Sequence, residues 1–452
     1  MPVRIGILGN YGHHNNGDEA ILWGLLRQLS AWPQPPQVTV FSFDPADTRR
    51  RHPQVEAAPV LVRKGGKAAL LPTLAALYRR LRRLDLLIIG GGALLMDTFR
   101  NQALLYTGVA RIARLAGVPV VYHAVGAGPI ETALGRWLIR ESANRAASVT
   151  VRDSESQALL RSIGVRRPVT VVSDPAFGLT AEDGLLLSDV DGPAAVKGPD
   201  PGAAKQDGSQ KTEKSIGFLP PRRPGVLRVG ISAMPCYYPG LASDGDAERY
   251  AAYVEGMRTL TRGLLAMEVP TAVEIVYFGT KYPQDVETAK EIVAGTGGGQ
   301  RLHVLDRELA PDELIALIGE LDMLIATRLH ALILATVAGT PSIGIAYRSK
   351  VRAIFADNGR EQWTVSPEER DWPKKLLGLW REMAARLDAE RLAVRQMAET
   401  NRQAAREQTL DLARLARTGV LPRDETGRDT GSPAADDNAG RGGTEPGEGG
   451  KR

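Results

Sequence analysis

The sequence predicts an α/β protein in which two Rossmann-like domains face each other across a cleft. Short apolar strands alternate with helical stretches over residues 1–180 and again over residues 227–418. This alternation is typical of parallel, doubly wound sheets. Between them, residues 181–226 lose the alternation and are rich in Asp, Gly, Lys, Ser and Pro. We expect this segment to be a flexible inter-domain insertion, because it has too little apolar surface to offset the entropy lost on ordering.

The predicted strands of the first domain are short runs of apolar residues that end in glycine or polar turns. They are Arg4–Leu8, Gln37–Ser42, Leu86–Ile89, Val118–Ala124, Ser148–Arg152 and Val169–Val172. The helices predicted between them have apolar residues at helical spacing. They are Glu19–Leu29, Ala103–Ala116, Leu134–Ala146 and Glu155–Ile163.

The second domain repeats this order and ends in long helices. Its predicted strands are Leu227–Ser232, Ala272–Phe278, Leu302–Val304, Met323–Ala326 and Ser342–Ala346. Its predicted helices are Asp246–Met267, Pro283–Val293, Pro311–Gly319, Leu329–Ala338, Pro373–Leu387 and Ala389–Thr418. Residues 419–452 have almost no large apolar side chains, so we expect a disordered tail. Two such domains joined by a linker are glycosyltransferase-B-like in pattern.

Composition excludes several classes of protein. The chain has 452 residues and one cysteine, Cys236, so it has no internal disulfide and no thiolate metal site. The adjacent His13 and His14 have no obvious third ligand, so we predict no metal. The net charge of +5 is not organised as in a nucleic-acid binder. No apolar run approaches the ~18 residues of a transmembrane helix, and we expect a cytoplasmic protein.

One basic segment leaves a contact with a membrane open. The apolar residues 68–77 are followed by Arg79, Arg80, Arg82 and Arg83. A basic amphipathic helix of this kind can lie on the anionic inner surface of a membrane. The alternative is an ordinary half-exposed helix with a solvated basic face.

The most informative segment runs from Met323 to Lys350. A predicted strand ends just before Arg328, and a helix carrying His330 begins at once. The next strand ends in Tyr347-Arg348-Ser349-Lys350. Both strand ends lie at the carboxyl edge of a parallel sheet, where ligands bind in open α/β folds. Cations beside a helix N-terminus form an anion site, and a histidine there can transfer protons.

Glycine-rich loops follow strands of the first domain. The first is Gly9-Asn10-Tyr11-Gly12, continuing through Asn16 to Asp18 and Glu19. Glycines allow close approach of a ligand, and Asp18 can either cap the next helix or face a sugar hydroxyl. Gly90-Gly91-Gly92 follows a second strand and implies close approach of a ligand or of the first loop. Arg152 ends a further strand beside a helix start, where it either binds an anion or pairs with Asp153 or Glu155.

These motifs together resemble the polysaccharide pyruvyl transferase family, most closely its CsaB-type members. The resemblance covers nearly all of residues 3–180 and 227–360. The motifs on which it rests are Gly9-Asn-Tyr-Gly, Asn16-Gly-Asp-Glu-Ala, Gly90-Gly-Gly, Val151-Arg-Asp, Ser173-Asp-Pro-Ala, Arg328-Leu-His330 and the run from Ala338 to Lys350. The resemblance implies transfer of pyruvyl from phosphoenolpyruvate to two hydroxyls of a lipid-linked cell-wall precursor. The products are a cyclic ketal and phosphate, and the polymer then anchors S-layer proteins.

The resemblance assigns catalytic roles to Arg152, Arg328, His330 and Lys350. Cations suit the carboxylate and phosphate of phosphoenolpyruvate, and His330 is the best acid or base. We expect no cofactor beyond this donor. The predicted substrate-binding residues are Asn10, Tyr11, Gly12, Asn16, Asp18, Glu19, Gly90, Gly91, Gly92 and Arg348. The alternatives are a nucleotide-sugar glycosyltransferase of the same architecture and a non-catalytic sugar-binding regulator.

Overall fold

The computed structural model describes residues 2–60, 70–98, 101–185, 219–238, 245–268, 271–297 and 299–418. The N-terminal domain contains β1 (Arg4–Leu8), β2 (Gln37–Ser42), β3 (Glu56–Pro59), β4 (Leu86–Gly90), β5 (Ala93–Leu95), β6 (Val120–Ala127), β7 (Ser148–Val151) and β8 (Val169–Val171). Its sheet has the order β3-β2-β1-β4-β6-β7-β8, and β5 pairs with β6. The described pairings in this sheet are parallel.

Helices pack on both faces of this sheet. They are α1 (Asn16–Ser30), α2 (Pro45–Arg51), α3 (Leu70–Leu81), α4 (Gln102–Leu115), α5 (Ala133–Asn144) and α6 (Ser154–Ser162). Two apolar clusters fill the layers, one around Phe41 and Val125 and the other around Ile5 and Leu22. The domain is therefore doubly wound, as the strand–helix alternation predicted.

The C-terminal domain contains a second parallel sheet. Its strands are β9 (Val226–Ser232), β10 (Ala272–Tyr277), β11 (Leu302–Val304), β12 (Met323–Ala326), β13 (Ser342–Ile345) and β14 (Thr364–Val365). They lie in the order β11-β10-β9-β12-β13-β14. The helices are α8 (Ala247–Leu265), α9 (Gln284–Ala294), α10 (Pro311–Gly319), α11 (Leu329–Ala338), α12 (Ser349–Asp357), α13 (Trp372–Ala385) and α14 (Leu387–Thr418).

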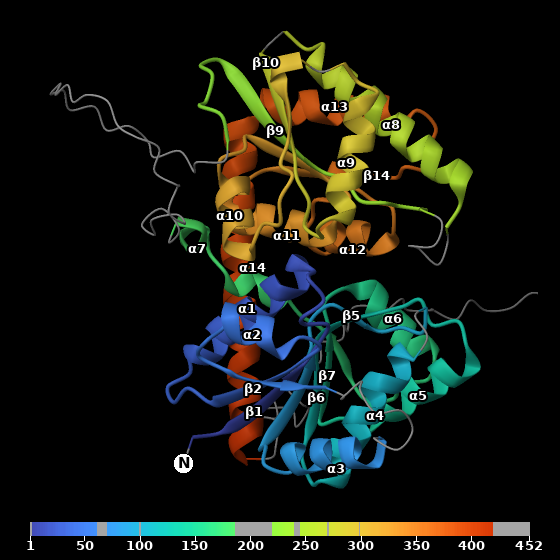
Figure 1. Cartoon of the computed structure of the whole chain (residues 1–452), viewed down its shortest axis with the longest axis vertical. Helices are drawn as coiled ribbons and strands as arrows, with labels where there is room; N and C mark the ends of the chain where they lie inside the picture. Colours follow the sequence, from blue (N-terminus) through green and yellow to red (C-terminus); the bar gives the residue numbers. More distant parts are fainter. Residues whose placement is uncertain are drawn as a thin grey trace, which may run out of the picture.

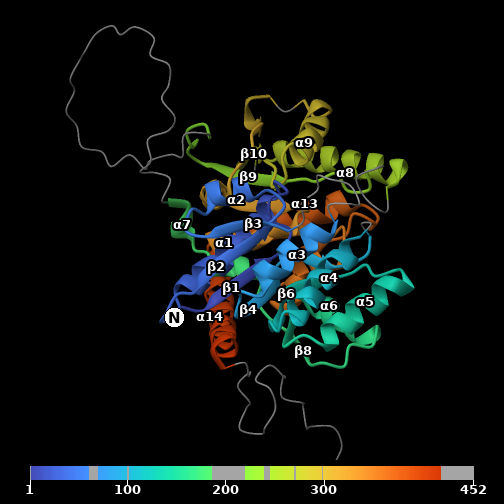
Figure 2. The same cartoon turned by 60° about the horizontal axis from the view of Figure 1, so that its bottom comes forward.

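The two domains are stacked with the carboxyl ends of their strands facing each other. In Figure 1, α10, α11 and α12 lie along the lower edge of the C-terminal domain, opposite α1, α2 and β5. The long helix α14 runs beside both domains in Figure 1, and Figure 2 shows its C-terminal part near β1. Its last turns place Leu412 and Leu415 in the apolar cluster around Ile5 of the N-terminal domain. The architecture is glycosyltransferase-B-like, as predicted.

The structure adds elements that the sequence pattern did not predict. They are α2, β3, β5, α12 and β14. The strands among them have between two and four residues, and α12 begins directly after the polar run Tyr347-Arg348. Segments this short carry little periodic signal, so their formation depends on pairing with longer neighbours.

The segment predicted as a flexible insertion is partly ordered. Residues 181–185 form α7 (Ala181–Leu185), which packs against α10, and Leu219 is buried in the C-terminal apolar cluster. Thr180 donates from its backbone N–H to Asp183 at 2.7 Å, which stabilises the start of this short helix. Residues 186–218 and the tail 419–452 lie outside the described residues.

The basic helix is α3, and it is amphipathic. Leu77 and Leu81 are buried against the N-terminal sheet, while Leu71 is 77% exposed and Tyr78 is 37% exposed. The arginines at its end face solvent. Both interpretations of this segment are compatible with such a helix.

Candidate active site in the inter-domain cleft

A cavity of about 320 Å³ lies between the two domains. From the N-terminal side it is lined by the loops after β1, β5 and β7, and from the C-terminal side by those after β9, β10, β12 and β13. Strand order reverses at β1 and β4 in one sheet and at β9 and β12 in the other. Ligands of doubly wound sheets bind at such switch points. The cavity therefore occupies the expected ligand position of both domains at once.

Arg328 is fixed in the cavity by a buried carboxylate. It occupies the N-cap position of α11, directly after β12. Its Nε donates to both carboxylate oxygens of Asp285 at 3.1 Å, and Asp285 is fully buried. Asp285 also accepts from the backbone N–H groups of Thr280 and Lys281. A guanidinium held this way keeps one edge for an anion.

His330 lies in the first turn of α11 and reaches across the cleft. Its imidazole packs against Gly17 of α1, where a Cβ atom would collide with it. Arg152 of the N-terminal domain donates from Nη1 to His330 Nε2 at 3.3 Å. Because arginine has no acceptor atom, Nε2 must accept and the imidazole proton sits on Nδ1. Burial and the charges of Arg152, Lys350 and Arg328 hold the pKa of His330 well below its usual value.

Arg152 is itself anchored by carboxylates of its own domain. It follows β7, and its Nη1 donates to Asp174 Oδ2 at 3.3 Å while Asp153 lies at 3.8 Å from Nε. Asp153 also caps α6 by accepting from Ser156 N–H at 2.7 Å. The predicted pairing of Arg152 with Asp153 is thus present, but it accompanies the contact with His330 rather than replacing it.

Lys350 and Arg348 approach from the start of α12. Arg348 is the N-cap residue, and Lys350 lies in the first turn. Both line the cavity. Burial, followed by the charges of Arg152, Arg348 and Arg328, lowers the pKa of Lys350 to about 8. The four predicted catalytic residues are therefore gathered at one cavity, although they come from segments up to about 200 residues apart in the sequence.

The N-terminal wall carries a carboxylate with amide neighbours. Asp18 lines the cavity together with Asn10 and Asn15. Asn15, not Asp18, caps α1 by accepting from Gly17 N–H at 3.2 Å. The helix-cap interpretation of Asp18 is therefore wrong, because the helix begins two residues before it. The carboxylate is turned toward the cleft instead.

Several predicted substrate-binding residues lie behind the cavity wall rather than on it. Tyr11 is buried and donates to the Gly90 carbonyl at 2.7 Å. Gly12 donates from its backbone N–H to Glu19 at 2.9 Å, and burial raises the pKa of Glu19 to about 7. Asn16 donates from its backbone N–H to the Thr280 carbonyl of the other domain at 3.1 Å. These residues shape the loop that presents Asn10 and Asp18.

The three glycines after β4 make room for protein atoms. A Cβ at Gly91 would collide with Ile21 of α1, and one at Gly92 would lie 2.9 Å from Asp18 Oδ1. Gly90 faces the carbonyl of His123 in β6. Close approach of the first loop and its helix, the alternative considered from the sequence, accounts for these glycines. These glycines were predicted to contact the substrate directly. That prediction does not match their positions behind the cavity wall.

The sequence pattern missed other residues that the structure brings to the cavity. Lys281 and Gln284 line it from the segment that follows β10. Asp285, next to them, accepts hydrogen bonds from Arg328 behind the cavity wall. Met96, Thr98 and Gln102 line the N-terminal side. The strand before Lys281 was predicted. Since the loop after a parallel strand lies at the carboxyl edge of the sheet, this position could have indicated Lys281 and Gln284 as site residues.

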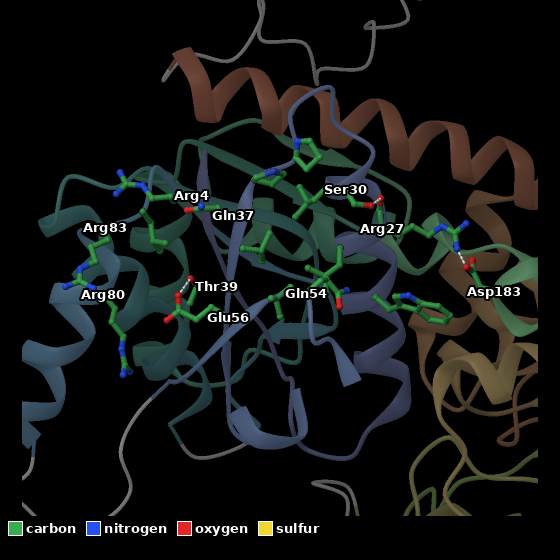
Figure 3. Close-up of a pocket in the computed structure, with 18 residues that line it drawn as sticks. Arg4, Arg27, Ser30, Gln37, Thr39, Gln54, Glu56, Arg80, Arg83 and Asp183 are labelled. Carbon is green, nitrogen blue, oxygen red and sulfur yellow. Dashed lines mark hydrogen bonds and ion pairs between the residues drawn. The ribbon is translucent and has the colours of Figure 1, made fainter. Parts of the chain in front are cut away.

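A larger cavity of about 860 Å³ lies elsewhere, at the amino ends of β1, β2 and β3 (Figure 3). Polar residues there are paired with one another: Arg27 with Asp183 and Thr39 with Glu56. It lacks a histidine and does not lie between the domains. Its greater volume does not make it the better site for chemistry.

No helix among residues that the structure describes is long and apolar enough to cross a membrane. Within the same residues, no group of three or more His, Cys, Asp or Glu side chains is placed to hold a metal ion.

Comparison with solved structures identifies the fold. The chain is similar to Anabaena HepE in complex with UDP-glucose, with a TM-score of 0.56 and 12% identity over 91% of this chain and 99% of that chain. It is similar to the UDP-GlcNAc 2-epimerase of Neisseria meningitidis bound to UDP-GlcNAc, with the same score, identity and coverage. A glycosyltransferase from Rickettsia africae gives a TM-score of 0.58 at 8% identity over 92% of this chain and 99% of that one.

At these identities the similarity establishes the architecture alone. A comparison with curated proteins finds no matching sequence. A family model described as polysaccharide pyruvyl transferase matches residues 15–228 and 268–349, which together make up more than half of the chain. The matched ranges include Asp18, Arg152, Arg328 and His330.

Proposed function

This chain belongs to the polysaccharide pyruvyl transferase family, and we propose that it transfers the pyruvyl group of phosphoenolpyruvate to two hydroxyls of one sugar. The products are a cyclic ketal and inorganic phosphate. The acceptor is proposed to be a lipid-linked precursor of a cell-wall polysaccharide, modified in the cytoplasm at the inner membrane surface. The mature polymer would serve in anchoring S-layer proteins, and neither a cofactor nor a nucleic acid takes part.

The observation that carries this proposal is the contact between Arg152 and His330 across the cleft. It unites an acid–base group with a cluster of cations that includes Arg328 and Lys350. Phosphoenolpyruvate carries a carboxylate and a phosphate, so several fixed cations suit it. A sugar-binding regulator has no need of this combination.

The state of His330 supports a role as acid. In the free protein its pKa is depressed by burial and by three cations, so the imidazole is neutral. A bound multiply charged anion would offset those cations and compete for Arg152, which frees Nε2 and raises the pKa of His330. The imidazole would then be protonated only when the donor is present. A proton on Nε2 could pass to the methylene carbon of phosphoenolpyruvate.

The two walls of the cavity suggest how the substrates divide it. The C-terminal wall supplies Lys281, Arg328, Arg348 and Lys350, which suit the anionic donor. The N-terminal wall supplies Asn10, Asn15, Asp18 and Gln102, whose polar groups suit sugar hydroxyls. Ketal formation would take place between them, beside His330.

The experiment is a phosphate-release assay with phosphoenolpyruvate and a synthetic lipid-linked disaccharide, with His330→Ala beside the wild type. We expect His330→Ala to lower turnover by about 100-fold or more, since general acid–base catalysis contributes roughly 10²–10⁴-fold. His303→Ala is the matched control, because His303 pairs with Glu274 in the C-terminal sheet, outside the cavity. Retention of more than about a tenth of wild-type turnover by His330→Ala would refute the acid–base role.

A glycosyltransferase using a UDP-sugar is the second candidate, because the similar solved structures include complexes with UDP-glucose and UDP-GlcNAc. The same assay separates the two. Glycosyl transfer would release UDP from a UDP-sugar and would leave phosphoenolpyruvate unconsumed.

A further inference from the structure

Asp18 differs from the other carboxylates around the cavity. Asp285 and Asp174 hold the guanidinium groups of Arg328 and Arg152, and Glu19 is buried behind the wall. Among residues that the structure describes, Asp18 is the one carboxylate that lines the cavity itself. Its side chain is therefore available for contact with a substrate.

Only one oxygen of Asp18 is used by the protein. Oδ2 accepts from Asn10 Nδ2 at 2.7 Å and from Asn15 Nδ2 at 2.8 Å. No described residue donates a hydrogen bond to Oδ1. The absence of a side chain at Gly92 lets the carboxylate lie close to the loop after β4, because a Cβ there would be only 2.9 Å from Oδ1. Two amides thus fix the orientation of the carboxylate at the cavity wall, while the hydrogen-bonding capacity of its second oxygen is not used by the described residues.

The surroundings of Asp18 suit proton transfer. The residue is 6% exposed, and burial raises the pKa of its carboxyl group. The hydrogen bonds from Asn10 and Asn15 and the charges of Arg152 and Lys350 oppose that shift, which keeps the ionised form accessible. A buried carboxylate of raised basicity accepts a proton more readily than one in water.

We propose that Asp18 is the general base that takes the proton from the sugar hydroxyl that attacks phosphoenolpyruvate. This inference rests on the proposed pyruvyl transfer and places the first acid and the first base of that reaction on different walls of the cleft. His330, on the C-terminal wall, protonates the methylene carbon of the donor. Asp18, on the N-terminal wall, deprotonates the first attacking hydroxyl of the acceptor.

The steps balance with these two groups alone. Protonated His330 gives its proton to the methylene carbon, which becomes a methyl group and leaves a cationic centre at C2. The first hydroxyl forms a C–O bond to C2 and loses its proton to Asp18. The bond from C2 to the phosphate oxygen then breaks, and the leaving phosphate takes that proton from Asp18. The second hydroxyl closes the ketal at C2 and returns a proton to His330.

The test compares Asp18→Asn with the wild type, since asparagine preserves the shape and can still accept from Asn10 and Asn15. We expect the dissociation constant for phosphoenolpyruvate, measured by calorimetry, to stay within about threefold, while kcat falls about 100-fold or more. The acid limb of the wild-type kcat–pH profile should be absent from the residual rate of the variant. Asp183→Asn is the control, because Asp183 is also buried but pairs with Arg27 outside the cleft.

The outcomes separate the two proposals. If Asp18→Asn keeps kcat and raises only KM for the acceptor, Asp18 merely binds the sugar and the inference is wrong, while pyruvyl transfer stands. An unchanged acid limb in the variant would overturn it as well. If the wild type consumes no phosphoenolpyruvate with any sugar acceptor, the proposed function fails, and the role of Asp18 fails with it.

Discussion

Buried carboxylates hold the arginines of this cleft in place. Asp285 accepts two hydrogen bonds from Nε of Arg328, and Asp174 accepts one from Nη1 of Arg152. Both carboxylates are covered by protein, so a ligand would meet the guanidinium groups and not their partners. These carboxylates fix the guanidinium groups before substrate binds, so the arginine side chains lose less rotamer entropy on binding.

Asp285→Asn should therefore weaken the binding of phosphoenolpyruvate. The neutral amide accepts only on one atom and leaves Arg328 poorly oriented, so we expect the dissociation constant to rise about tenfold or more, which is ~1.4 kcal/mol. Calorimetry measures this, and thermal unfolding shows whether the variant is folded. Asp306→Asn is the matched control, because Asp306 pairs with Lys290 at the exposed surface. Equal affinity in both variants would contradict a positioning role for Asp285.

Lys350 makes donor binding dependent on pH. Its pKa is lowered to about 8, so the free protein loses this charge as the pH rises through that value. We expect the dissociation constant for phosphoenolpyruvate to increase above pH 8 and to be unaffected by the titration of Lys350 well below that pH. Lys350→Arg keeps its charge throughout this range and should flatten the profile. The same rise above pH 8 in that variant would exclude Lys350 as its source.

The sequence could predict those site residues that directly follow a strand. Arg152, Arg328, His330 and Lys350 each lie within a few residues of a strand end, and parallel strands bring their carboxyl ends to one edge. Asp285 could not be predicted in its role, because it lies in the first turn of α9 and only the tertiary structure brings it to Arg328 at the start of α11. Buried partners of this kind leave no periodic or motif signal.

At the scale of elements, the start of α1 is fitted closely to the opposite domain. Gly17 is buried in its first turn, directly beneath the His330 imidazole. The helix can approach α11 this closely only because residue 17 has no side chain. The glycine-rich segment predicted to allow close approach of a ligand is thus also part of the contact between the domains.

Gly17→Ala should disturb catalysis without unfolding the protein. The added methyl group would displace His330, and we expect turnover to fall about tenfold or more, because small misplacements of a reacting group are costly. Gly108→Ala is the matched control in another helix, since a Cβ there meets no atom within 4 Å. Phosphate release and circular dichroism are measured for both. Full activity of Gly17→Ala would show that the position of His330 tolerates displacement and would contradict the close fit.

The predicted elements that the structure contains include the central strands of both sheets. Leu86–Ile89 and Met323–Ala326 are buried on both faces and form central strands, β4 and β12. The edge strands β3 and β14 went unpredicted, because Glu56-Ala-Ala-Pro and Thr364-Val365 gain their structure only by pairing with β2 and β13. The other two edge strands, β8 and β11, were predicted from the sequence, so the pattern defines the sheet centres and some of the edges.

At the scale of the whole molecule, α14 ties the domains together. Figure 1 shows that it runs from the C-terminal domain to the N-terminal domain, and its last turns contribute to the apolar cluster around Ile5. Asn401 in its middle accepts from Ser173 at 2.9 Å and donates to Asn358 at 2.7 Å, so it contacts both domains. The position of the cleft walls therefore depends on this helix. The sequence predicted that this segment is helical, but it did not predict that the helix extends from one domain to the other.

Leu412→Ala should weaken the attachment of α14 to the N-terminal domain. Leu412 is 4% exposed, and truncating a buried leucine costs about 2–5 kcal/mol of unfolding free energy. Leu410→Ala, two residues away and 36% exposed, should change it by less than about 0.5 kcal/mol. Urea unfolding compares the two. Equal effects would mean that the end of α14 is not packed as described.

The central claim is that the cleft joins phosphoenolpyruvate to a sugar. The most direct test incubates the wild-type protein with phosphoenolpyruvate and a lipid-linked disaccharide, then examines the acceptor by mass spectrometry and NMR. We predict that the sugar gains a pyruvyl ketal and that one phosphate is released for each ketal formed. An unmodified acceptor with phosphoenolpyruvate left intact, or sugar transfer from a UDP-sugar instead, would contradict the account.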